Sequence, residues 1–134
     1  TLYGLGDPSP FMFLGQILSA LRNDSAFEMT SGRQLREYHH FLDDAQAIRQ
    51  VVDSQTTGVI SLSNGKPVAL KEIAQQVFSV FCKSHLLRIG ALPEPAEENY
   101  DKINLESDFV ENITFRNSLS GIVDYMKACY SSKA

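Results

Sequence analysis

Apolar residues recur at helical spacing in several stretches of the chain. The clearest stretch covers 70–81, where apolar side chains at i, i+3, i+4, i+7, i+8 and i+11 line one helix face. Another helix is expected to begin at Ser9–Pro10, because serine is a good N-cap and proline suits the first helical position, and to end near 23–25. We expect a last helix from about Asn117, and a short one after Ser107.

The stretches between these helices favour strands and turns. Helix signals are weak over 26–41 and Ser31–Gly32 interrupts that stretch, so we expect two short strands around a turn. A helix then follows Asp43, which we interpret as its N-cap. Further strands are expected over 58–62 and 86–91. The order of elements predicts an α/β fold with a small mixed sheet and about five helices.

Composition narrows the class of protein. The 134 residues, 43% hydrophobic and 21% charged, are ordinary for one domain over 1–134. A net charge of −4 argues against nucleic acid and anionic membrane surfaces as partners, and no apolar run approaches the roughly 20 residues of a membrane helix. Two cysteines are too few for a disulfide framework, so we expect a cytoplasmic protein. Because the chain starts at Thr1 without an initiator methionine, we expect a fragment of a longer protein.

Most tests for catalytic chemistry within the chain are negative. The serines lie in turns or helix starts and no G-x-S-x-G elbow occurs. Cys82 and His85 have the spacing of half a metal site, but no second pair lies near in the sequence, so we expect no metal. His39 and His40 are adjacent, so on a strand they point to opposite faces. None of the five tyrosines is followed four residues later by lysine, so we expect no catalytic residue in this chain.

The first residues, TLYGLGD, raise the possibility of a cofactor-binding loop. A dinucleotide-binding fingerprint requires G-x-G-x-x-G, in which the third glycine lets a helix pack close to its strand. Gly4 and Gly6 are present, but the third glycine is missing. The segment by itself therefore leaves open whether it is a degenerate loop or another kind of turn.

Four stretches in sequence order resemble segments of the extended short-chain dehydrogenase/reductase family, whose members are NAD-dependent epimerases and dehydratases of nucleotide sugars. LYGLGD is similar to the family's Y-G-P-G-D segment. GRQLREYHHFLDDAQAI resembles G-x-x-x-R-D-Y-[IV]-H-V-x-D-x-A. GVISLSNGKPVALKEIAQQV resembles G-x-x-Y-N-[IL]-G-[ST]-G-x-x-[VT]-S-[LI]-x-E-[LI]-A, and RIGALP is similar to part of the family's tail.

The resemblance implies that this chain is the C-terminal substrate-binding lobe of a Rossmann-related enzyme. The part that binds NAD or NADP, with its glycine-rich loop and its Tyr-x-x-x-Lys pair, then lies outside this chain. The parent protein is expected to be an epimerase or dehydratase whose ligand is a nucleoside-diphosphate sugar. The chain alone is expected to be inactive and to bind no cofactor.

Candidate ligand-binding residues follow from the same resemblance. The arginine of the family's R-D-Y motif contacts the substrate diphosphate, which assigns this role to Arg36, whose guanidinium group suits two phosphate oxygens. The alternative is that Arg36 forms a surface ion pair with Glu28 or Glu37. Phe27 and Met29 fall where relatives line the nucleotide base pocket, although apolar residues on a short strand are equally typical of a core.

Other motif positions are assigned structural roles by the resemblance. Gly4 and Gly6 are expected to form a tight turn that leads into the lobe, and Asp43 and Gly65 to shape loops. In the parent, 58–62 is expected to pair with a strand that is absent here. Because an unpaired strand edge favours association, we expect a homodimer.

Two departures from the family pattern favour an alternative function. His39 stands where the family has isoleucine or valine, and Glu94–Pro95 stands where relatives commonly have Tyr-Arg. A carboxylate in place of a guanidinium group weakens the binding of a diphosphate. The chain could therefore belong to a non-catalytic relative that acts as a binding or sensing module, and the sequence does not define the nucleotide, the sugar or the reaction.

Overall fold

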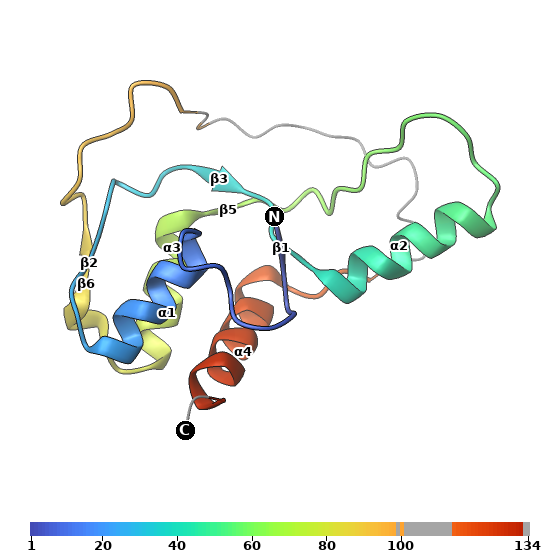
Figure 1. The fold of residues 1–134 in the computed structure, drawn as a ribbon. Coiled ribbons are helices and arrows are strands. Elements are labelled where there is room, and N and C mark those ends of the chain that lie inside the picture. Colours follow the sequence, from blue (N-terminus) through green and yellow to red (C-terminus); the bar gives the residue numbers. More distant parts are fainter. Residues whose placement is uncertain (99, 101–113, 133–134) are drawn as a thin grey trace.

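The computed structural model describes residues 1–98, 100 and 114–132 of the chain (Figure 1). In these residues it has four α-helices, one 3-10 helix and six short strands. In chain order the elements are β1 (Leu2–Tyr3), α1 (Phe13–Asn23), β2 (Phe27–Met29), β3 (Leu35–Arg36), β4 (His39–His40), α2 (Phe41–Asp53), β5 (Val68–Ala69), α3 (Leu70–Val80), η1 (Ser84–Leu86), β6 (Leu87–Ile89) and α4 (Ser118–Ser131).

In the described part of the chain the strands pair two by two and do not form the small mixed sheet expected from the sequence. β1 pairs with β4 and β2 with β6 in parallel, whereas β3 pairs with β5 in antiparallel. Each strand is two or three residues long. β4 passes directly into α2, and β5 passes directly into α3. Each of these strands therefore ends after two residues, which keeps its sheet small.

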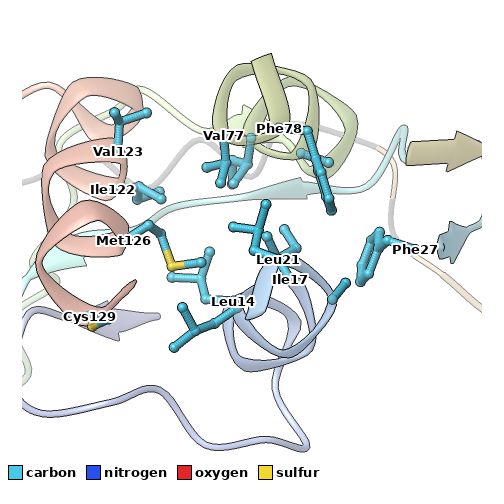
Figure 2. Packing of buried hydrophobic residues seen from close by; sticks show 14 of the residues in the cluster. Leu14, Ile17, Leu21, Phe27, Val77, Phe78, Ile122, Val123, Met126 and Cys129 are labelled. Carbon is cyan, nitrogen blue, oxygen red and sulfur yellow. The ribbon is translucent and has the colours of Figure 1, made fainter. Parts of the chain in front are cut away.

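The hydrophobic core lies where α1, α3 and α4 meet (Figure 2). Ile17, Leu21, Phe78 and Met126 have no exposed surface, and they bring together side chains from all three helices. Phe27 of β2 closes one side of this cluster, with its ring centroid 5.7 Å from that of Phe78. The helices therefore supply most of the buried apolar surface, which is the main favourable term in folding.

Helix α3 follows the predicted apolar stripe and confirms the expected helix over 70–81 to within one residue. Its buried residues are Ile73, Ala74, Val77 and Phe78. The carboxylate of Glu72 accepts a hydrogen bond of 3.0 Å from the backbone N–H of the N-cap residue, as in one half of a capping box.

Helix α1 begins later than the sequence predicts. The Ser9 carbonyl oxygen accepts a 3.0 Å hydrogen bond from Met12 N, which closes a turn, and Met12 is the extended N-cap residue. A Cβ atom on Gly15 would stand 1.8 Å from the Ser9 oxygen, so glycine lets this turn lie directly on the helix. The end was predicted correctly, since Asp24 is the left-handed C-cap residue.

The other expectations have mixed outcomes. The stretch 26–41 contains three strands, not two. The strand expected over 86–91 is confirmed as β6, and α4 begins as expected after Asn117, whose side chain accepts a 3.1 Å hydrogen bond from Ser120 N. The helix expected after Ser107 lies outside the described residues. No helix in the part of the chain that the structure describes is long and apolar enough to cross a membrane.

The strand expected over 58–62 is absent. This segment has no regular secondary structure, and the Val59 side chain is fully exposed. Its β-branched residues favour a strand locally, but a strand requires a partner to satisfy its backbone groups. Among the described residues no strand pairs with this segment, and β5 forms the pair with β3 instead.

Helix α2 extends away from the three-helix core (Figure 1). It begins at Phe41, and its N-cap is His40, whose Nδ1 atom accepts a 3.2 Å hydrogen bond from Leu42 N. The expectation that Asp43 is the cap is therefore wrong. Only Asp43 and Ala47 of this helix are buried.

Asp43 instead anchors α2 to the start of α4. Its Oδ2 atom accepts hydrogen bonds of 3.0 Å from both the backbone N and the Nε of Arg116, and its Oδ1 accepts one of 2.9 Å from Nη2. Burial raises the pKa of Asp43, but the hydrogen bonds and charge of Arg116 outweigh it, so the pKa lies below its ordinary value. A cavity of about 560 Å³ lies beside this pair.

We expect Asp43→Asn to lower the free energy of unfolding at pH 7 by about 1–3 kcal/mol, because the variant lacks the charge-assisted hydrogen bonds to Arg116. The folded-state pKa of Asp43 is depressed. Its contribution is therefore complete above the unfolded-state value of about 3.9 and is lost as pH falls through the folded-state value. Urea unfolding at pH 7 and pH 3 measures this, and the gap between wild type and variant must narrow at pH 3. Asp53→Asn, at the exposed end of α2, is the control and should change little.

Gly121 of α4 permits close contact with Tyr3. A Cβ atom there would stand 2.1 Å from the Tyr3 hydroxyl oxygen, which is buried and has no hydrogen-bond partner among the described residues. We expect Gly121→Ala to destabilise the fold by about 1–3 kcal/mol through overpacking, although alanine is the better helix former. Denaturant unfolding should show partial recovery in the double variant Tyr3→Phe/Gly121→Ala. Equal stability of wild type and Gly121→Ala would contradict this packing.

Candidate functional site

Arg36 ends β3 and directs its guanidinium group towards the segment that follows β6. Its Nη2 atom donates to Glu98 Oε1 at 2.8 Å, and its Nη1 atom donates to the Leu35 carbonyl oxygen at 2.9 Å. The side chain of Arg36 is 37% exposed and that of Glu98 is 19% exposed. Glu28 and Glu37, the partners considered from the sequence, contact other residues: Glu28 lies 3.8 Å from Arg88, and Glu37 lies within hydrogen-bonding distance of His39. Arg36 is thus in an ion pair, but with a carboxylate that the sequence did not indicate.

A second carboxylate attaches the same segment to the connection between β2 and β3. We call residues 94–98 the acidic segment. Glu94 Oε1 accepts a 2.9 Å hydrogen bond from Ser31 N, and Glu94 Oε2 accepts one of 2.7 Å from the Tyr100 hydroxyl. These hydrogen bonds from Ser31 and Tyr100 lower the pKa of Glu94 to about 2. The Arg33 guanidinium group lies over the Tyr100 ring, 4.5 Å from its centroid.

Phe27 and Met29 lie on β2 and are buried in the core. The Phe27 ring packs against Phe13, at a centroid distance of 5.9 Å, as well as against α3. The Cε atom of Met29 stands 2.6 Å from the position of a Cβ atom on Gly32, so it fills the space that glycine leaves. Both side chains therefore have packing roles, and a role in binding a nucleotide base stays a prediction.

An apolar cavity of about 270 Å³ lies beside β1 and the start of α1. Its lining includes Leu2, Phe13 and Tyr38. Burial raises the pKa of Tyr38, and the nearby charge of Arg36 acts in the opposite direction.

A buried histidine with two carboxylate partners was not predicted from the sequence. The side chain of His39 is 7% exposed, with Nε2 2.7 Å from Glu37 Oε1 and Nδ1 2.6 Å from Asp44 Oδ1. Glu37 also accepts hydrogen bonds from Ser63 Oγ, at 2.8 Å, and from Asn64 N. Burial opposes ionisation of Glu37, but these hydrogen bonds hold its pKa below the ordinary value. The cluster connects the end of β4 to α2 and to the turn after 58–62.

Gly4, Gly6 and Gly65 all have positive φ angles, of 119°, 63° and 66°. At Gly4 the constraint is also steric, since a Cβ atom there would stand 2.5 Å from His40 Nε2. The His40 ring contacts Tyr3 edge-on at a centroid distance of 5.3 Å. It thus faces β1, whereas the neighbouring histidine faces α2, in agreement with opposite directions on a strand. The assignment of these glycines to family motifs stays a prediction.

Residues 1–98, 100 and 114–132 contain no candidate metal site. No group of three or more His, Cys, Asp or Glu side chains suited to a metal ion occurs in this part of the chain. Cys82 is exposed and Cys129 is buried, and both are free thiols.

The fold matches parts of solved enzymes of nucleotide-sugar metabolism. A dTDP-glucose 4,6-dehydratase from Bacillus anthracis, solved with NAD, matches 99% of this chain and 43% of its own chain, at a TM-score of 0.72 and 13% identity. A UDP-N-acetylglucosamine 4-epimerase from Methanobrevibacter ruminantium matches 100% of this chain and 44% of its own, at a TM-score of 0.68 and 20% identity. MoeE5, solved with UDP-glucose and NAD, matches 100% of this chain and 46% of its own, at a TM-score of 0.70 and 20% identity.

Sequence comparison gives no such match. The sequence matches no protein-family model and no curated protein. The chain spans less than half the length of the solved enzymes that it resembles. At these identities the match concerns the fold: the chain has the fold of part of the NAD-dependent nucleotide-sugar epimerases and dehydratases, the extended short-chain dehydrogenases.

Proposed function

We propose that this chain is the nucleotide-sugar-binding, C-terminal lobe of an NAD(P)-dependent epimerase or dehydratase that acts on a nucleoside-diphosphate sugar. The observation that carries the proposal is that virtually the whole chain aligns with enzymes of this kind, one of which holds UDP-glucose and NAD. NAD or NADP is then bound by residues outside these 134, as are the catalytic tyrosine and lysine. Such a cofactor would supply reversible hydride transfer with the sugar, and the tyrosine would serve as acid and base.

Arg36 is the residue that we assign to the substrate diphosphate. Its guanidinium group is partly exposed at the end of β3. A planar guanidinium group binds two phosphate oxygens in a fork. This geometry supports a phosphate-bearing ligand at the end of β3.

Exposed apolar side chains support a longer polypeptide. Ile48 and Val52 of α2 are exposed, as is Val59 in the segment that follows. We propose that the cofactor-binding part of the same polypeptide covers these side chains, since burying them removes apolar surface from water. In the isolated chain a second copy would cover them, which gives a homodimer.

The second candidate is a non-catalytic relative that binds or senses a ligand. It is favoured by one observation, the ion pair between Arg36 and Glu98, which places a carboxylate where the enzyme would hold a phosphate. The two candidates differ in the residues that precede this chain. A glycine-rich G-x-x-G-x-x-G loop and a Tyr-x-x-x-Lys pair in the longer polypeptide favour the enzyme, and their absence favours the binding module.

We expect Arg36→Ala in the longer polypeptide to weaken binding of nucleoside diphosphates by about ten- to a hundredfold. The physical reason is the removal of charge-assisted hydrogen bonds worth roughly 1.5–3 kcal/mol. Calorimetric titration with a panel of nucleoside diphosphates measures the dissociation constants, and thermal melts monitor folding.

Arg88→Ala is the matched control for this experiment. Arg88 lies on β6, is more exposed than Arg36 and approaches its partner Glu28 only to 3.8 Å. Its replacement should leave the dissociation constants unchanged. An unchanged constant for Arg36→Ala as well would remove Arg36 from the site.

We expect the 134-residue chain on its own to show no saturable binding of NAD and no turnover. The reason is that the glycine-rich loop and the Tyr-x-x-x-Lys pair are not in its sequence. Equilibrium titration with NAD up to millimolar concentration measures this. A saturable micromolar signal would refute the division of roles proposed above.

A further inference from the structure

Two carboxylates of the acidic segment accept hydrogen bonds from donor groups of the kinds that bind phosphate. Glu98 takes the Nη2 donor of Arg36, and Glu94 takes the backbone N–H of Ser31. Guanidinium groups and backbone N–H groups in turns are the usual ligands of phosphate oxygens. The bonds are 2.8 and 2.9 Å long, which is the range of charge-assisted hydrogen bonds.

The two contacts have similar sequence separations on the two segments. Ser31 and Arg36 lie five residues apart on one segment, and Glu94 and Glu98 lie four residues apart on the other. The acidic segment is therefore held along the β2–β3 connection at two points. The Tyr100 hydroxyl donates to Glu94 at 2.7 Å and fixes this carboxylate further.

The Arg36–Glu98 contact is also weak enough to be exchanged. The arginine is more than one third exposed, and exposed ion pairs stabilise proteins little because water and salt screen them. A diphosphate carries more charge than one carboxylate, so it forms the stronger pair with a guanidinium group. Glu98 opposes this pairing, because its carboxylate accepts one hydrogen bond from Nη2, neutralises the guanidinium charge and repels a second anion.

We propose that Glu98 is an internal competitor for the anionic group of the ligand, on a segment that Glu94 also attaches, so that phosphate binds at Arg36 against the charge and the hydrogen bond of Glu98. This inference rests on the proposed function, in which Arg36 binds a diphosphate. Glu98 and Glu94 then lower the affinity of the site for phosphate alone. Tight binding therefore requires a ligand whose uncharged part also contacts the protein.

The test measures the dissociation constants of inorganic pyrophosphate and of UDP by calorimetry, in the longer polypeptide that carries this chain. The variants are Glu98→Gln, Arg36→Ala, the double variant Arg36→Ala/Glu98→Gln, and Glu97→Gln as the matched control. Glu97 belongs to the same acidic segment and is exposed, so its replacement removes the same charge from the segment without the contact to Arg36. Thermal melts establish that each variant is folded.

We expect Glu98→Gln to bind pyrophosphate about two- to tenfold more tightly than wild type, and Glu97→Gln to bind as wild type does. In the double variant the gain must disappear. Equal gains for Glu97→Gln and Glu98→Gln, or a gain that persists without Arg36, would reduce the effect to general charge and overturn the inference.

Failure of the inference is distinguishable from failure of the proposed function. Equal and measurable dissociation constants for wild type, Glu98→Gln and Glu97→Gln overturn the competition and leave the diphosphate site intact. Absence of binding of both pyrophosphate and UDP in every folded variant, including Glu98→Gln, overturns the diphosphate site and the competition with it.

Discussion

Helix packing is the constraint on which the structure of this chain depends. The strands that the structure describes are two or three residues long and pair in twos, so their ladders satisfy few backbone groups and bury little surface. Stability therefore rests on α1, α3 and α4, whose apolar stripes meet around Phe78 and Met126. Everything that lies outside this cluster must be attached to it by other interactions.

Polar contacts between residues far apart in sequence supply these attachments. Asp43 and Arg116 connect the protruding helix α2 to α4, and His39 holds Glu37 and Asp44 together between β4 and α2. Such pairs gain little when they are exposed, but a partner left unpaired in a buried place costs several kcal/mol. They consequently fix the position of α2 more than they add to the stability of the fold.

The sequence predicts features that depend on neighbouring residues, and it misses features that depend on residues far apart in the chain. The stripe of α3 is recoverable because helical burial repeats every 3.6 residues, and the start of α4 follows from the side chain of Asn117. The strand over 58–62 is missed because pairing depends on a neighbour that the local pattern does not specify. Residue spacing likewise indicates neither Glu98, 62 positions from Arg36, nor the role of Asp43.

The same difference between local and distant partners bears on function. A sequence motif identifies a phosphate-binding arginine from the residues next to it in the sequence. How readily its guanidinium group binds phosphate depends also on the side chains that the fold brings into contact with it. Here the chain places one carboxylate against Arg36, which the motif assigns to ligand binding, and another against the backbone N–H of Ser31, just outside the motif. A ligand that displaces such a carboxylate must first break its hydrogen bond, and the free energy of that bond is subtracted from the affinity of the ligand. A fold shared with nucleotide-sugar enzymes is therefore compatible with very different phosphate affinities, and side chains distant in sequence decide between them.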